Sequence, residues 1–289
     1  MCRNQGESTA TVRERTAKKL EAHGIENASK EAEWLLMRAT GRSRLDLIIR
    51  PDQVVSLAED IHLSTLLERR CAREPLQYII GSADFYGRTF LVNPSVLIPR
   101  PETEELVEAV LELPASDLAG GVIDLGTGSG CIPVSVVLER EGIPCTGVDL
   151  SSKALDVARA NAAHLGAHVT WVEADMADPS LSRLIGEAAS VLVSNPPYIP
   201  EAEKASMQAE VLQHEPHMAL FAGEDHLFFY KVIADQAGRL LHAGGHVLVE
   251  IHADAGQAVR HLFKEAGMRD VVLQQDMAGR DRIVRARVP

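Results

Sequence analysis

The sequence predicts an α/β protein in which a mostly parallel sheet carries helices on both faces and a small helical domain comes first. Two observations support this prediction. From about residue 121 onward, short apolar stretches typical of strands alternate with longer stretches typical of amphipathic helices, and this alternation favours a parallel sheet. Before about residue 75, apolar residues recur at spacings of three and four, which is the period of a helix.

Length and composition indicate the class of protein. A chain of 289 residues with 46% hydrophobic content is long enough for a real core and for two domains. No apolar stretch approaches the roughly 18 residues of a membrane span, and the polar residues 1–6 lack a signal-peptide hydrophobic region. The four cysteines are scattered, with no Cys-x-x-Cys pair. We therefore expect a cytoplasmic protein with no metal site and no membrane partner.

The net charge of −12 is unevenly spread. Residues 1–75 contain 13 Lys and Arg against 12 Asp and Glu, a net charge of about +1, so the remainder carries about −13. An acidic catalytic part is a poor match for nucleic acid, because non-specific affinity for DNA comes mainly from phosphate neutralisation. A protein substrate is therefore expected.

Residues 1–75 are predicted to form a domain of four or five short helices, in which Gly24 and Gly41 mark the ends of two. A bundle carries no chemistry by itself. It could be pure scaffold, or it could dock the substrate, and the sequence leaves both interpretations open.

Residues 76–98 are predicted to link this domain to the catalytic domain, residues 99–289. Aromatic residues on either side of Gly87 suggest a β-hairpin in the linker. Next, Pro99 and Pro101 frame Arg100, and Pro101 can start a helix. Because the prolines fix its direction, Arg100 is expected to hold a carboxylate near the ligand site rather than merely solvate the linker.

The first strand of the catalytic domain, residues 121–125, runs into a glycine-rich loop before a helix that begins near Cys131. Glycines let the backbone turn tightly and approach a ligand at the start of a helix. The spacing is Gly-x-Gly-x-Gly rather than the dinucleotide fingerprint Gly-x-Gly-x-x-Gly. It resembles the loop with which methyltransferases hold S-adenosylmethionine. The residues of this expected cofactor loop are Gly126, Thr127, Gly128, Ser129 and Gly130.

Acidic residues follow the next two strands. Asp149, in the strand of residues 145–150, could accept hydrogen bonds from both ribose hydroxyls. A helix cap is the alternative role, but the two serines that follow already offer one. After the strand of residues 168–173, Asp175 could meet the adenine amino group and Met176 could pack on the ring, although a surface acid is more often solvated.

The fourth strand ends at the segment Asn195-Pro196-Pro197-Tyr198. The prolines remove two backbone donors and keep the chain extended. The Asn195 side-chain carbonyl and the backbone carbonyls of Asn195 and Pro196 are then free to accept. They could bind both protons of a planar NH2 group while Tyr198 packs on its face. The plain alternative is a proline turn beside a core tyrosine, but the upstream glycine loop favours a functional site.

Helices, strands and one possible lid complete the chain. Residues 201–213 are predicted to form a helix or lid, and residues 214–220 a tight loop that could close over the site. The remaining elements are a helix at 225–241, a strand at 245–251, a helix at 253–266 and strands near 270–275 and 282–287.

Nearly the whole chain resembles the HemK-type family, the glutamine methyltransferases of class-I peptide chain release factors. Two motifs carry the resemblance: Ile-Pro-Arg-Pro-Glu-Thr at residues 98–103 and Asn-Pro-Pro-Tyr-Ile at residues 195–199. The resemblance implies a Rossmann-like class I S-adenosylmethionine-dependent methyltransferase with S-adenosyl-L-homocysteine as its product. The target would be the amide nitrogen of the glutamine in a Gly-Gly-Gln motif. A monomer is expected.

The resemblance also implies roles for individual residues. Residues 126–130 would bind the cofactor, together with Asp149, Asp175, Met176 and Asn195. Asn195, Pro196, Pro197 and Tyr198 would hold the glutamine, with Asn195, Pro196 and Tyr198 taking part in catalysis. There are two departures. His252 stands where members of the family often have glycine, and Met176 stands where some have an aromatic residue.

Two other functions compete with this interpretation. An adenine-N methyltransferase acting on DNA or RNA would meet the same two N–H donors, and Tyr198 could stack on a flipped base. The acidic charge of the catalytic part argues against it. A protein that binds S-adenosylmethionine without catalysis is the other possibility, and the intact Asn-Pro-Pro-Tyr segment argues against that.

Overall fold

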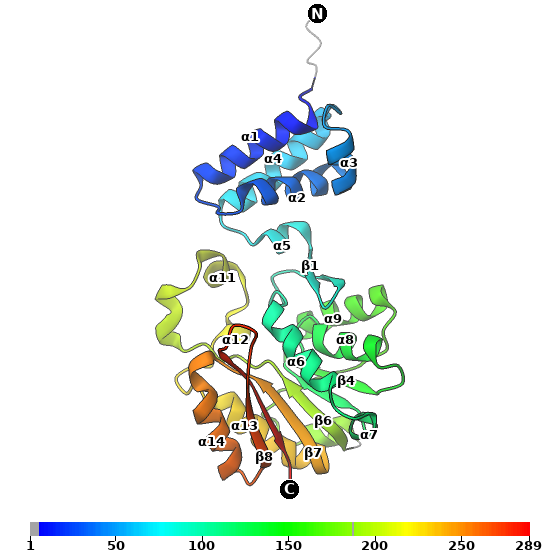
Figure 1. Ribbon diagram of the computed structural model, residues 1–289, viewed down its shortest axis with the longest axis vertical. Helices are drawn as coiled ribbons and strands as arrows, with labels where there is room; N and C mark the ends of the chain where they lie inside the picture. The colour runs from blue at the N-terminus through cyan, green and yellow to red at the C-terminus, as the bar shows by residue number, and fades with distance from the viewer. Residues whose placement is uncertain (1–5, 187) are drawn as a thin grey trace, which may run out of the picture. The chain divides into compact units, whose positions relative to one another are not determined.

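The computed structural model describes residues 6–186 and 188–289 (Figure 1). Residues 1–5 lie outside the described residues. They include most of residues 1–6, for which the sequence predicts no signal peptide. The contacts divide the chain into two compact units. One consists of Met1–Gly81 with Gln208–His214, and the other of Ser82–Met207 with Glu215–Pro289. Among the described residues, no helix is both long and apolar enough to cross a membrane, and no group of acidic, His or Cys side chains could hold a metal ion.

The first unit is a bundle of short helices, as predicted. Ser43 and Ser56 each begin a helix with a capping box, in which the serine side chain accepts from the third helical N–H and an acidic side chain accepts from the serine N–H. The buried side chains on the inner faces are mostly leucines. The helices are α1 (Thr9–Ala22), α2 (Ala28–Thr40), α3 (Arg44–Ile49), α4 (Leu57–Cys71) and α5 (Leu76–Ile80).

A sixth helix, α11 (Ala209–His214), belongs to this unit although it lies far along the chain. The buried guanidinium of Arg70 donates to Glu31 at 2.6 Å and to Glu210 of α11 at 3.3 Å. Arg73 donates to the same Glu210 carboxylate at 3.1 Å. Two arginines of the bundle therefore hold α11.

The second unit contains a seven-stranded sheet with the order β5-β4-β3-β6-β7-β9-β8. The first five strands in this order, β5, β4, β3, β6 and β7, are parallel to one another, and β9 is antiparallel to both β7 and β8. This confirms the mostly parallel sheet. The strands are β3 (Val122–Leu125), β4 (Cys145–Asp149), β5 (Thr170–Glu173), β6 (Ala189–Ser194), β7 (Leu241–Glu250), β8 (Arg269–Gln275) and β9 (Asp281–Arg287).

The chain order reverses between β3 and β6. From β3 the chain proceeds outward through β4 to β5, and it then returns to add β6 on the other side of β3. At such a switch point the crossover connections diverge, and ligands of open α/β sheets bind at the carboxyl ends of the strands there. The glycine loop follows β3 and Asn195 follows β6, so both lie at this switch point.

Helices cover both faces of the sheet, because alternate side chains of the central strands point to opposite faces. Ile123 and Leu192 pack in one cluster with α13 (Phe228–Leu240) and α14 (Gly256–Glu265). Val122, Val191 and Val193 pack in a second cluster. The helices that contribute to it are α6 (Pro101–Leu111), α8 (Cys131–Glu139) and α9 (Ser152–Leu165).

The predicted hairpin is present as β1 (Ser82–Phe85) and β2 (Arg88–Leu91). Tyr86 and Gly87 both have positive φ, of 49° and 70°, as the tight hairpin turn requires. The residues before it, Leu76–Ile80, are helical, and the contacts divide the chain after Gly81. The predicted linker, residues 76–98, therefore starts with a short helix before the hairpin.

The segment after Asn-Pro-Pro-Tyr differs from the prediction. Glu201–Ser206 is a 3-10 helix, separate from α11, and residues predicted as a tight loop include the helix α12 (His217–Leu220). The structure also contains two short helices that were not predicted, α7 (Ala115–Leu118) and α10 (Leu181–Ile185). Helices of four to six residues are too short to show a helical period in the sequence.

Candidate active site

A cavity of about 410 Å³ opens at the carboxyl ends of the parallel strands, within the second unit. This volume is in the range of small-molecule sites. One wall is apolar and comes from the chain after the 3-10 helix, including Met218, Phe221, Phe228 and Phe229. The predicted site residues that line it are Gly126, Gly128, Asp149, Asp175, Met176, Asn195 and Pro197.

The glycine loop has the tight backbone turns that its sequence predicts. Gly126, Gly128 and Gly130 all have positive φ, between 55° and 77°, which only glycine adopts without strain. Gly126 and Gly128 face the cavity. A Cβ on Gly130 would instead lie 2.8 Å from the Trp171 ring. Thr127 and Ser129 are buried behind the loop and, like Gly130, do not line the cavity.

Asp149 ends β4, the strand next to β3, and its side chain contacts the glycine loop. Its carboxylate accepts from the Gly128 N–H at 2.8 Å and from the Ser151 N–H at 2.9 Å. Burial raises the pKa of Asp149, and these two hydrogen bonds oppose the rise. Each carboxylate oxygen has a second lone pair, so Asp149 can still accept from a hydroxyl group in the cavity.

Asp175 and Met176 both line the cavity after β5. The exposed Asp175 side chain accepts from its neighbour Ala177 N–H at 2.8 Å, which makes a local turn. The Met176 methyl would lie 3.2 Å from a Cβ built on Gly126, so the thioether lies beside the glycine loop. Its backbone is held by Gln236, which donates to the Met176 carbonyl at 2.9 Å.

Asn195 follows β6 at the wall of the cavity, and its side-chain NH2 donates to the Thr103 hydroxyl at 3.0 Å. Pro197 also lines the cavity, whereas Pro196 and Tyr198 do not. The Tyr198 hydroxyl donates to the carboxylate of Glu250 at 3.1 Å. Burial and the Glu250 charge raise the pKa of Tyr198. The Tyr198 ring meets the His252 ring edge-on, with 6.1 Å between centroids.

Arg100 does hold a carboxylate, and that carboxylate is on the protein. Its guanidinium donates to Glu215 at 2.6 Å, and the Ile98 N–H donates to the other Glu215 oxygen at 3.2 Å. Glu215 directly precedes Pro216, which lines the cavity. The interaction therefore ties the apolar wall to the segment before α6.

Asp124 is a further acidic residue beside the site, and no role was predicted for it. It is completely buried in β3, and its carboxylate oxygens lack a hydrogen-bond partner among the described residues. Burial raises its pKa to about 7, and the charge of Asp149 adds to the rise while the nearby Thr127 hydroxyl opposes it. The signal available in the sequence was an acidic residue within an apolar strand, just before the glycine loop. A buried acid without a partner requires an explanation.

The chain matches two family profiles in different parts. A profile described as the PrmC N-terminal domain matches residues 11–81, and one described as a methyltransferase small domain matches residues 103–224. The chain is 40% identical over 265 residues to the release factor glutamine methyltransferase of Geobacter sulfurreducens, covering 92% of this chain and 91% of that protein. It is 42% identical over 264 residues to the protein of the same name from Neisseria gonorrhoeae, covering 88% and 91%.

Solved structures are similar in fold. A methyltransferase from Pyrococcus furiosus is 14% identical with a TM-score of 0.51, covering 79% of this chain and 98% of that one. A 16S rRNA N2 G1207 methyltransferase from T. thermophilus, solved with AdoMet and guanosine, is 18% identical with a TM-score of 0.50, covering 72% and 50%. At these identities the likeness concerns the fold alone.

Proposed function

Because the chain belongs to the release factor glutamine methyltransferase family, we propose that it methylates class-I peptide chain release factors on the glutamine of their Gly-Gly-Gln motif. The methyl group would come from S-adenosyl-L-methionine and go to the side-chain amide nitrogen. The observation that carries the proposal is the orientation of Asn195, which directly follows β6 at the cavity and whose NH2 donates to Thr103. Its carbonyl oxygen is thereby left to accept from an incoming amide NH2.

The cavity fits S-adenosyl-L-methionine in three ways. Gly126 and Gly128 let a ligand approach the backbone, Asp149 offers acceptors for ribose hydroxyls, and the wall of Met218, Phe221 and Phe228 suits an apolar ring. The buried Asp124 carboxylate, which has no hydrogen-bond partner in the described part of the chain, would be stabilised by a positively charged ligand nearby. When bound, the cofactor supplies a methyl group on a positively charged sulfur.

The other predicted cofactor residues have supporting roles in this proposal. Thr127, Ser129 and Gly130 would support the conformation of the loop on the side that faces away from the cavity. Met176 would pack against the adenine ring, where its thioether can serve the face that an aromatic residue would otherwise cover. Asp175 at the rim would meet the adenine amino group.

The chain's own part in the reaction follows from the chemistry of an amide. The nitrogen lone pair is delocalised into the carbonyl, so the nitrogen is a poor nucleophile until its NH2 group is twisted or pyramidalised. Acceptors from Asn195 and the Pro196 carbonyl favour that geometry and stabilise the positive charge that develops on nitrogen. The methylated nitrogen is strongly acidic and releases a proton to solvent, so no general base is required.

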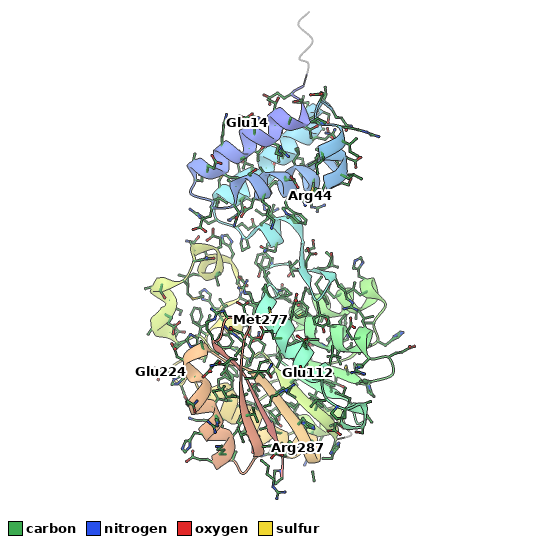
Figure 2. The ribbon with its side chains drawn as sticks, in the orientation of Figure 1. Glu14, Arg44, Glu112, Glu224, Met277 and Arg287 are labelled. Atoms are coloured by element: carbon green, nitrogen blue, oxygen red, sulfur yellow. The ribbon has the colours of Figure 1, made fainter. Side chains whose placement is uncertain are left out.

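The proposal assigns substrate docking to the helical unit. Exposed large apolar side chains occur on α3, which carries the labelled Arg44 in Figure 2, and on α4. Apolar side chains gathered on a surface commonly mark protein interaction sites. They are Leu45, Ile48, Ile49, Leu57 and Ile61, each 60% to 76% exposed. We refer to these five residues as the apolar docking residues. With a release factor as partner, the enzyme would act in the cytoplasm as a monomer.

Transfer of labelled methyl groups tests the proposal. Purified protein, labelled S-adenosyl-L-methionine and a class-I release factor are combined, alongside the same factor with its Gly-Gly-Gln glutamine changed to alanine and a DNA sample. Label is expected on the intact factor alone. Label on DNA, or equal label on the altered factor, would contradict the proposal.

A further inference from the structure

A buried chain of hydrogen bonds lies behind Asn195. Its NH2 donates to the Thr103 hydroxyl at 3.0 Å, and Thr103 donates to one oxygen of Glu250 at 2.7 Å. The other Glu250 oxygen accepts from the Tyr198 hydroxyl at 3.1 Å. Thr103 is 3% exposed and Glu250 is 1% exposed. Four residues from three separate parts of the second unit therefore share one network.

This network has a defined direction. A carboxylate only accepts, so Thr103 must use its single hydroxyl proton on Glu250. The Thr103 oxygen can then only accept from Asn195, which forces the NH2 end of the Asn195 amide toward Thr103. The carbonyl end is left for the cavity. With the opposite polarity, Asn195 would present donors to the donors of a substrate NH2 group.

Glu250 is held as an acceptor by its surroundings. Burial raises the pKa of its carboxyl, while the hydrogen bond from Thr103, the positive charge of Arg282 and the hydrogen bond from Tyr198 oppose the rise. The Tyr230 hydroxyl also donates to the Glu250 backbone carbonyl at 3.2 Å, which holds the end of β7 in place.

The position of Thr103 explains part of the motif at residues 98–103. Pro101 occupies the first turn of α6, and Thr103 follows two residues later in the same turn. The fixed φ of the proline sets where the helix begins. A start shifted by one residue would turn Thr103 by about 100° around the helix axis and away from Asn195.

We infer that Thr103 and Glu250 are positioning residues for methyl transfer, which set the polarity of the Asn195 amide and so direct its carbonyl oxygen to the substrate nitrogen. The inference rests on the proposed function. Neither residue lines the cavity, so each acts through Asn195. The competing explanation is a polar pair that only stabilises the fold, and the two explanations differ in what they predict for kcat.

Isosteric variants separate these explanations. T103V keeps the shape of the side chain and removes the hydroxyl, so the Asn195 amide loses the partner that orients it. E250Q can donate to Thr103, which frees Thr103 to donate to Asn195 and favours the reversed amide. Each variant is expected to lower kcat by about 10- to 100-fold, with the KM for S-adenosyl-L-methionine within about twofold of wild type. T103S is expected to recover most of the loss.

The double variant T103V/E250Q adds a second criterion. Because both residues act through Asn195, the kcat of the double variant is expected to be no lower than that of the single variant with the lower kcat. The control is S135A, which removes a buried hydroxyl without a partner among the described residues, in the same unit. S135A is expected to match wild type in kcat. Thermal unfolding of every variant shows whether the fold is retained.

A measurement that does not require methyl transfer tests the inference about Thr103 and Glu250 separately from the proposed function. In an NMR spectrum with ¹⁵N-labelled asparagine, the Asn195 NH2 signal is identified by its loss in N195A. T103V and E250Q are expected to shift that signal, and S135A is not. An unshifted signal, or wild-type kcat in T103V, would overturn the inference. A wild-type protein that transfers no methyl group while the signal shifts as expected would instead contradict the proposed function.

Discussion

The guanidinium of Arg100 donates to the carboxylate of Glu215 over 2.6 Å, and the Glu215 side chain is only 1% exposed. A charge buried to this extent depends on its partner, because leaving it unpaired is costly. Glu215 directly precedes Pro216, which lines the cavity together with Met218 and Phe221, so the ion pair connects the stability of the second unit to the shape of the cavity.

Replacement of Arg100 by alanine is expected to lower the free energy of unfolding by about 2 to 3 kcal/mol. This is less than for a fully buried pair because Arg100 is 32% exposed. Affinity for S-adenosylhomocysteine should fall as well, since the wall loses its anchor. Denaturant unfolding and calorimetry measure the two effects. The matched control is R239A, which breaks an exposed ion pair with Asp235 and should change stability by less than 1 kcal/mol. Equal effects of the two variants would contradict this prediction.

Replacement of Asn195 by alanine is expected to reduce kcat by about two orders of magnitude and to leave cofactor affinity nearly intact. The reason is that its carbonyl would act on the substrate nitrogen as charge develops there, whereas the proposed cofactor contacts are made by the glycine loop and Asp149, which line the cavity. Steady-state kinetics and titration with S-adenosylhomocysteine check the two halves. An unchanged kcat would remove Asn195 from the mechanism.

Replacement of Asp124 by asparagine is expected to change how stability depends on pH. The pKa of Asp124 rises from 3.8 to about 7 on folding. Between these values the folded protein binds a proton that the unfolded chain has released, so this group makes the protein less stable as the pH rises through that window. D124N should therefore gain stability over wild type between pH 5 and pH 8, on the order of 3 kcal/mol. Denaturant unfolding of both proteins without cofactor measures this, and a difference that does not vary with pH would argue against it.

Replacement of Gly130 by alanine is expected to destabilise the protein more than replacement of Gly142. Both glycines have positive φ, of 77° and 85°, so both variants incur similar backbone strain. At Gly130 the new Cβ would also lie 2.8 Å from the Trp171 ring, whereas a Cβ on Gly142 would have no other described residue within 4 Å apart from its chain neighbours. G130A should be less stable than G142A by about 1 to 3 kcal/mol. Thermal unfolding compares the two variants. Equal midpoints would contradict the prediction, because they would show that the Trp171 ring can move away at no cost.

Charged substitutions among the apolar docking residues are expected to affect only the large substrate. I48D and L57D should raise the KM for an intact release factor severalfold, because a charge at an apolar contact must lose its hydration. Transfer to a short Gly-Gly-Gln peptide should match wild type, since the second unit alone holds the cavity. The control is E14A, which changes an exposed residue on α1 of the same unit (Figure 2). Similar losses with peptide and protein would contradict docking at this surface.

Many elements of the fold could be predicted from local sequence features. The strands before the glycine loop and before Asn195 are apolar runs that end in residues unable to continue a strand, and the paired prolines mark that end sharply. Both segments therefore had to lie at carboxyl ends of parallel strands, where the cavity is found. Short helices such as α12 escaped prediction because one turn shows no period.

The sequence by itself determined which residue types end the strands, because the conformations of glycine and proline depend on their own covalent structure. Only the tertiary structure decided which side chains meet. Thr103 and Glu250 lie 147 positions apart, and Arg100 and Glu215 lie 115 apart. Thr103 and Glu250 meet because α6 packs against β7, and Arg100 pairs with a carboxylate that is buried. Neither relationship leaves a periodic signal in the sequence. The same packing turns the Tyr198 hydroxyl to Glu250 and directs Asn195 to the cavity.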